Sequence, residues 1–162
     1  MTAPTSSGAA VVTLPTDSQI LITREFAAPS QLVFRAWTTP DLIRRWWHAN
    51  RGEVTVAEVD LRVGGRWRFV QVTPDGFEVA FSGEYREIVP GQRLVWSEIY
   101  ERMPDAPALQ TMTLTERDGR TGMTILGEYG SRQVRDAVLE SGMEAGMQDA
   151  LSLLERVAVS EH

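Results

Sequence analysis

Six consecutive stretches of alternating apolar and polar residues constrain the fold of this chain more than any other feature. Short turn sequences separate them, such as TPDG at residues 73–76 and VPG at residues 89–91. A period of two predicts strands that bury one face, and tight connections of this kind join antiparallel neighbours. The predicted strands are residues 54–61, 65–72, 77–88, 93–101, 109–117 and 123–129. The sequence therefore predicts an antiparallel meander.

Further elements flank the meander on both sides. Residues 18–26 alternate like a first strand, and two short helices are expected to begin near Pro29 and Pro40, because proline is favoured in the first helical turn. The second of these helices is expected to end in RRWWHAN, residues 44–50. From Ser131 to about Ala158, apolar residues step by threes and fours along one face, which predicts one long helix.

These elements predict an α+β fold in which a seven-stranded curved antiparallel sheet wraps around the C-terminal helix, with two short helices between strands one and two. Residues 1–17 lack a basic or long apolar segment and are expected to form a flexible tail. We expect one domain over residues 18–158 and a short C-terminal tail over residues 159–162.

Composition excludes several classes of function. The net charge of −6 offers no broad positive field for nucleic acid, and the chain has no cysteine for thiol catalysis, thiolate metal sites or disulfides. All basic residues are arginine, so lysine Schiff-base chemistry is excluded as well. No signal peptide or membrane span is evident, and a cytoplasmic location is expected. The sequence indicates no metal and no cofactor.

The tryptophan pair in RRWWHAN has two interpretations. Leaving both Trp46 and Trp47 exposed would be costly, so at least one is expected inside, either sealing the core or stacking on a ligand. His48 follows them where the helix is expected to end, and it has no nucleophile motif or second metal ligand in the sequence to serve.

Candidate acids and bases are few. Tyr85 and Glu87 are expected on the same strand face as Phe81, and Glu98 has no obvious partner. A carboxylate on an apolar face is costly unless it is paired, so each acid is interpreted either as paired near a strand end or as a group inside a cavity. With His48, these residues are the only weak catalytic candidates.

Two glycines interrupt an otherwise good helical pattern in the last predicted helix. Gly142 and Gly146 each cost a helix about 1 kcal/mol relative to alanine, so the missing side chains require an explanation. Either the helix presses against another backbone there, or the glycines leave room for a guest beside Met143 and Met147.

The order of several segments resembles a known family. FAAPSQLVFRAWTTPDLIRRWW, EVDLRVGGRWRF, GEYREIVPGQRLVW, GRTGMTI and SGMEAGMQDALSLLERV are similar to the activator of heat-shock-chaperone ATPase homologues, C-terminal-domain-like, within the START-like (SRPBCC) helix-grip superfamily. The resemblance implies a curved sheet gripping a C-terminal helix with a cavity between them. Where the family pattern commonly has glycine and proline after the second tryptophan, this chain has His48-Ala49-Asn50. Chaperone binding is not expected, because residues 1–17 cannot supply the additional domain of the eukaryotic activators.

Three functions follow as hypotheses. The first is a non-enzymatic module that binds a small apolar or aromatic molecule between the sheet and the long helix. The second is a cyclase-like or dehydratase-like enzyme, and the third is a protein-interaction module. The residues expected to contact the ligand are Trp37, Trp46, Trp47, Trp67, Phe69, Phe81, Tyr85, Trp96, Met112, Met143 and Met147.

Overall fold

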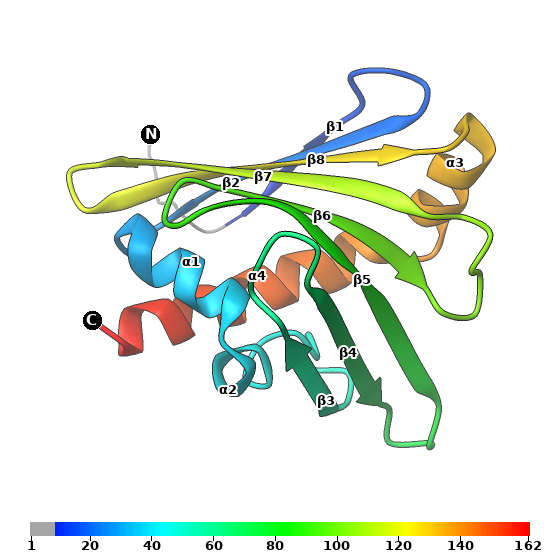
Figure 1. The fold of residues 1–162 in the computed structure, drawn as a ribbon, viewed down its shortest axis with the longest axis horizontal. Coiled ribbons are helices and arrows are strands. Elements are labelled where there is room, and N and C mark those ends of the chain that lie inside the picture. The colour runs from blue at the N-terminus through cyan, green and yellow to red at the C-terminus, as the bar shows by residue number, and fades with distance from the viewer. Residues whose placement is uncertain (1–8) are drawn as a thin grey trace.

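A single curved antiparallel sheet forms the framework of the computed structural model, which describes residues 9–162 (Figure 1). Its eight strands lie in the order β1-β2-β8-β7-β6-β5-β4-β3, and the sheet is not closed into a barrel. The strands are β1 Val11–Thr13, β2 Gln19–Phe26, β3 Glu53–Val59, β4 Arg66–Val72, β5 Glu78–Val89, β6 Arg93–Tyr100, β7 Ala108–Arg117 and β8 Arg120–Tyr129. All seven predicted strands are present, with bounds that differ from the expected ones by a few residues.

The helices lie on the concave side of this sheet. They are α1 Ser30–Thr38, α2 Pro40–Ile43, α3 Arg132–Glu140 and α4 Met143–Ser160. The ribbon shows α4 running across the sheet, with α1 beside its C-terminal half (Figure 1). The helix-grip arrangement of an α+β fold is therefore confirmed.

The eighth strand comes from a segment that the sequence predicted as a tail. β1 pairs antiparallel with the edge strand β2, with Val11 opposite Thr23 and Thr13 opposite Leu21. A three-residue strand is too short to show alternation, and Val11 is largely exposed, so the sequence pattern could not distinguish this strand from a tail. Residues 1–8 of the predicted tail lie outside the described residues. At the other end α4 continues to Ser160, into the predicted C-terminal tail.

The predicted single long C-terminal helix is wrong, because the chain forms two helices there. Gly142 has a φ of 85°, in the left-handed region that favours glycine, and it separates α3 from α4. Gly146 does lie inside α4, but a Cβ placed on it would meet no atom within 4 Å. The expectation that the helix presses against another backbone is therefore wrong at Gly146.

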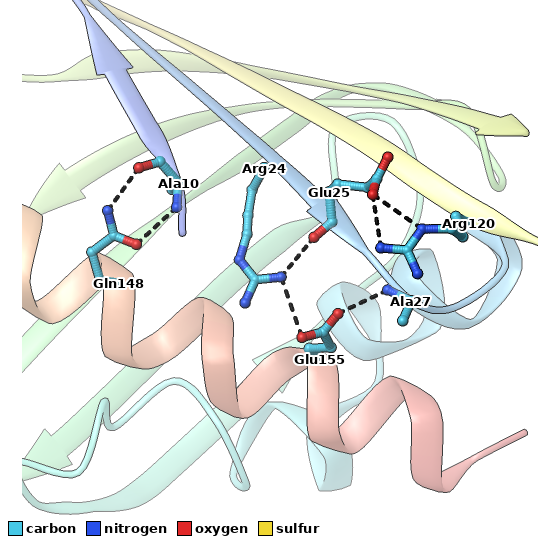
Figure 2. A network of polar contacts seen from close by, with 7 residues as sticks. All are labelled: Ala10, Arg24, Glu25, Ala27, Arg120, Gln148 and Glu155. Carbon is cyan, nitrogen blue, oxygen red and sulfur yellow. Dashed lines mark hydrogen bonds and ion pairs between the residues drawn. The ribbon is translucent and has the colours of Figure 1, made fainter. Parts of the chain in front are cut away.

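Polar contacts fasten α4 to the first edge of the sheet (Figure 2). The side-chain amide of Gln148 accepts from the backbone N–H of Ala10 at 2.9 Å and donates to its carbonyl at 2.8 Å, as a neighbouring strand would. About two turns further on, Glu155 accepts from Ala27 N at 2.8 Å and lies 3.5 Å from the guanidinium of Arg24. Burial lowers the pKa of Arg24, and the negative charge of Glu155 opposes that effect.

Apolar packing completes the attachment of α4. Its buried face consists of Leu151, Leu154, Val157 and Ala158, which run from the middle of the helix toward its C-terminal end. Met143 and Met147, in the N-terminal half, are only partly buried. The C-terminal half of α4 therefore belongs to the main core, and the N-terminal half lies at its margin.

Candidate ligand-binding cavity

A cavity of about 160 Å³ lies on the concave side of the sheet, between strands β4 to β6 on one side and α1 and the turns after α2 on the other. The volume is close to that of an engineered apolar cavity of about 150 Å³ that takes up benzene. The residues that line it are Trp37, Trp47, Trp67, Phe69, Phe81, Tyr85, Leu94, Trp96 and Glu98. All but Glu98 are aromatic or aliphatic.

The strand walls owe their aromatic lining to the alternation of β4 and β5. Trp67 and Phe69 are two residues apart on β4, so both point to the concave face, and Phe69 is opposite Phe81 in the sheet register. Trp67 is opposite Gly83, where a Cβ would lie 2.9 Å from the indole nitrogen. The glycine thus makes the space in which the largest ring of this wall lies.

The RRWWHAN segment forms the wall opposite these strands. It is a series of turns that follows α2, because α2 ends at Ile43, so the expectation that the segment ends a helix is corrected. Trp47 faces the cavity, with its ring centroid 5.6 Å from that of Phe69 and 5.9 Å from that of Phe81. Irregular backbone allows the adjacent Trp46 to point elsewhere, into the core.

Trp46 is a core residue and does not line the cavity. It is 2% exposed and donates from Nε1 to the carbonyl oxygen of Ala36 at 2.9 Å. Its ring packs edge-on against Trp37, with centroids 4.7 Å apart. The two interpretations of the tryptophan pair therefore apply to one residue each: Trp46 seals the core, and Trp47 forms a cavity wall.

His48 and Glu87 lie away from the cavity. His48 accepts a hydrogen bond from Asn50 N at 3.0 Å within the turn that follows Trp47. Glu87 forms an ion pair with Arg93 at 3.0 Å, and both side chains are exposed. The expected shared face of Tyr85 and Glu87 is wrong because a β-bulge between them shifts the register against β6.

Glu98 is the one carboxylate in the cavity wall. Oε1 accepts from Trp96 Nε1 at 3.2 Å, and Oε2 accepts from Gln110 Nε2 at 3.4 Å. Burial raises the pKa of Glu98 above its usual range, and these two hydrogen bonds counteract only part of that effect. Its surface is only partly exposed, and it borders the cavity.

A second row of polar residues supports Glu98 from behind. Gln110 Nε2 also lies 3.5 Å from the hydroxyl of Tyr129, and burial raises the pKa of that phenol. Gly127 is opposite Gln110, and a Cβ there would lie 2.9 Å from the Gln110 amide oxygen and 3.0 Å from the Tyr129 hydroxyl. Gly127 therefore leaves room for the side chains that hold Glu98.

Two further polar groups belong to the aromatic lining. Burial raises the pKa of the Tyr85 phenol, which therefore stays protonated at neutral pH. Trp37 Nε1 is buried and has no hydrogen-bond acceptor among the described residues. A buried N–H without an acceptor costs free energy.

The methionines expected to contact a ligand do not line the cavity. Met112 is fully buried in the core, and Met143 and Met147 lie on the N-terminal half of α4. The lining of this cavity includes no residue of α4. The expectation that the cavity lies between the sheet and the C-terminal helix is therefore corrected. Leu94, which the sequence analysis did not single out, does contribute to the wall.

Residues 9–162 contain no cluster of three or more histidine, cysteine, aspartate or glutamate side chains able to hold a metal ion. In the same residues no helix is both long and apolar enough to span a bilayer.

Comparison with known proteins identifies the family. Residues 27–158 match the profile described as activator of Hsp90 ATPase homolog 1-like protein. The chain belongs to this family. The match begins just after β2 and ends two residues before the end of α4, so it covers the cavity walls and most of the sheet. A comparison with curated proteins gives no significant match.

Solved structures with the same fold are numerous. A protein of Rhodobacter sphaeroides has 26% identity and a TM-score of 0.86, with 93% of this chain and 99% of that chain covered. A Mycobacterium smegmatis protein has 26% identity and a TM-score of 0.81, with 94% and 99% covered. A Nitrosomonas europaea protein has 24% identity and a TM-score of 0.81, with 93% and 99% covered. The likeness supports a START-like fold, of the kind found in ligand-binding and cyclase-like modules.

Proposed function

We propose that this member of the family binds a small hydrophobic or aromatic molecule in the cavity between α1 and strands β4 to β6, and that it does so without catalysis. One observation carries the proposal: a cavity of about 160 Å³ whose wall is made almost entirely of aromatic side chains. Mostly apolar walls with few polar groups are typical of ligand sites. At about 160 Å³ the cavity suits a guest of about one ring, which is smaller than most drug-sized ligands.

The first test is native mass spectrometry of protein purified gently from its own host, compared with the denatured mass. We expect a releasable extra mass that identifies the guest. A bare chain mass, together with no quenching of tryptophan fluorescence by added phenol or toluene, would contradict the proposal.

Trp37→Phe tests whether the Trp37 N–H donates a hydrogen bond to the guest, because the substitution removes the N–H and keeps an aromatic ring. We expect a loss of up to about tenfold in affinity for a ligand with an acceptor oxygen, the worth of one neutral hydrogen bond. Trp46→Phe is the matched control, because its N–H already has an acceptor in Ala36 and lies outside the cavity. The control is expected to lower stability and to leave the affinity of the folded protein unchanged.

A second function, a cyclase-like or dehydratase-like enzyme, draws on Glu98. A carboxyl whose pKa is raised by burial inside a cavity is suited to general acid and base catalysis. The test is incubation of the identified guest with protein and analysis of its mass over time. Conversion that Glu98→Gln abolishes would favour the enzyme, and an unchanged guest would favour the binding module.

A further inference from the structure

The chemistry of the cavity wall combines aromatic rings with one acidic group. Seven of the nine lining residues are aromatic, Leu94 is aliphatic, Glu98 is acidic and none is basic. The rings come from α1, the turns after α2, and strands β4, β5 and β6, so they surround the space on several sides. Aromatic faces carry negative electrostatic potential and attract cations within about 6 Å. The acid and the faces of the rings therefore favour positive charge, and the wall offers no cationic side chain to hold an anion.

Glu98 differs from the acids on the outer face of neighbouring strands. There Glu101 forms a fork of two hydrogen bonds with Arg68, and Glu84 lies 3.2 Å from Arg86. No cationic group among residues 9–162 forms an ion pair with Glu98, whose hydrogen-bond donors Trp96 and Gln110 are neutral. Buried carboxylates in proteins are normally paired with a positive charge. Glu98 has hydrogen-bond donors but no cationic partner among these residues.

We propose that the cavity takes a small organic cation of the alkylammonium class, with its positive group among the aromatic rings and beside the Glu98 carboxylate. The inference rests on the proposed function, since it names the class of ligand for the same cavity. The apolar outer surface of a methylated ammonium group suits walls of tryptophan and phenylalanine, and its charge suits both the ring faces and the acid.

Other ligand classes fit the wall less well. A metal ion needs several oxygen or nitrogen ligands, and the wall supplies one carboxylate. An anion would meet the negative ring faces and Glu98 with no arginine in the wall to hold it. A neutral aromatic molecule would satisfy the apolar surface but would leave Glu98 without a charged partner, so Glu98 would have to be protonated in that complex.

The test uses choline and its uncharged carbon isostere, 3,3-dimethylbutan-1-ol, which have nearly the same shape and share a hydroxyl. Binding is measured by calorimetry and tryptophan fluorescence with the full-length protein. We expect choline to bind roughly tenfold more tightly than the alcohol, the scale of a partly desolvated cation–π contact. Choline affinity should also rise with pH as Glu98 ionises, and the affinity of the alcohol should not.

Two variants assign the effect to the carboxylate. Glu98→Gln keeps the size of the side chain and should remove most of the preference for choline while leaving the affinity for the alcohol unchanged. Glu84→Gln is the control, because it removes the same charge from the outer face of β5, and it should bind both probes as the parent protein does.

Each contrary outcome has a separate meaning. If the parent protein binds the alcohol as tightly as choline, the cation proposal is wrong and the proposed function stands. If Glu98→Gln retains the preference for choline, Glu98 is not the counter-ion and the proposal is also wrong. If neither probe binds and native mass spectrometry shows the bare chain, both the cation proposal and the proposed function fail.

Discussion

The indole of Trp67 lies across Gly83 on the neighbouring strand and donates its Nε1 hydrogen to the carbonyl oxygen of Ser97, 3.2 Å away. The glycine is required because a Cβ at that position would overlap the Ser97 carbonyl and crowd the indole nitrogen. The position of Trp67 in the cavity wall therefore depends on the lack of a side chain at Gly83.

Gly83→Ala is expected to destabilise the protein by about 3 kcal/mol, since the new methyl group collides with backbone that cannot move without disturbing β6. Urea denaturation measures the free energy of unfolding. Gly122→Ala is the control, because there the added Cβ would meet only the Thr115 carbonyl at 3.8 Å, an ordinary contact. Equal effects from the two substitutions would contradict this account of Gly83.

The two glycines at the start of α4 are expected to respond in opposite directions. Gly142→Ala places a side chain in a left-handed conformation and should cost about 1 kcal/mol. Gly146→Ala adds a methyl group in open space inside a helix and should stabilise the protein by up to about 1 kcal/mol. Thermal unfolding of both variants gives the comparison, and a loss of stability in Gly146→Ala would mean that α4 packs more closely than the structure shows.

The anchoring of α4 depends on a buried charge. Glu155→Ala leaves the guanidinium of Arg24 with the Glu25 carbonyl but without a negative partner, and we expect a loss of about 3 kcal/mol. Arg120→Ala is the control, because its ion pair with Glu25 is exposed on both sides and should contribute less than about 1 kcal/mol. The difference is measured by urea denaturation at moderate salt. If Arg120→Ala lowers the free energy of unfolding as much as Glu155→Ala does, the buried charge is not what anchors α4.

Glu98 should give the unliganded protein a distinct pH dependence. Its folded pKa is raised above the unfolded value, so the folded state holds the proton over a range in which the unfolded state has released it. Stability is therefore lost as pH rises above the usual glutamate range, by up to about 1.4 kcal/mol per pH unit, until the folded pKa is passed.

The measurement is the free energy of unfolding against pH for the parent protein and for Glu98→Gln. The difference between the two curves should tilt in favour of the variant as pH rises and then become level. A flat difference across the whole range would show that Glu98 has an ordinary pKa in the folded protein.

Periodicity predicted the fold well because most strands here have one buried face. The alternation that defined residues 65–72 also placed Trp67 and Phe69 together on the inner face, and both line the cavity. The same reasoning failed at Glu87, since a bulge adds one residue to β5 and reverses the facing beyond it. The bulge does mark the sequence, because the apolar positions step from Tyr85 to Ile88 across two adjacent charged residues, but such a break in the alternation could also be the end of a strand.

The candidate site was predicted in part. Trp47 and Trp46 are adjacent in sequence, and only the irregular turns after Ile43 decide which of them faces the cavity. Glu98 could be named as an unpaired acid, but its support by Gln110 depends on the pairing of β6 with β7, which brings residues twelve positions apart side by side. Met143 and Met147 were assigned to the cavity because the helix was expected to lie over its centre.

Because α4 lies outside the cavity wall, the residues that stabilise the fold and the residues that recognise a ligand are largely different residues. Its contacts with Ala10, Arg24 and Ala27 decide how firmly the domain holds together, and none of these residues touches the cavity. Substitutions that strengthen or weaken the helix attachment can therefore accumulate without altering what the cavity accepts. Substitutions of the aromatic residues on β4 to β6 can change which ligand binds while the contacts that hold α4 are kept. Proteins with this fold can therefore bind different ligands without loss of stability.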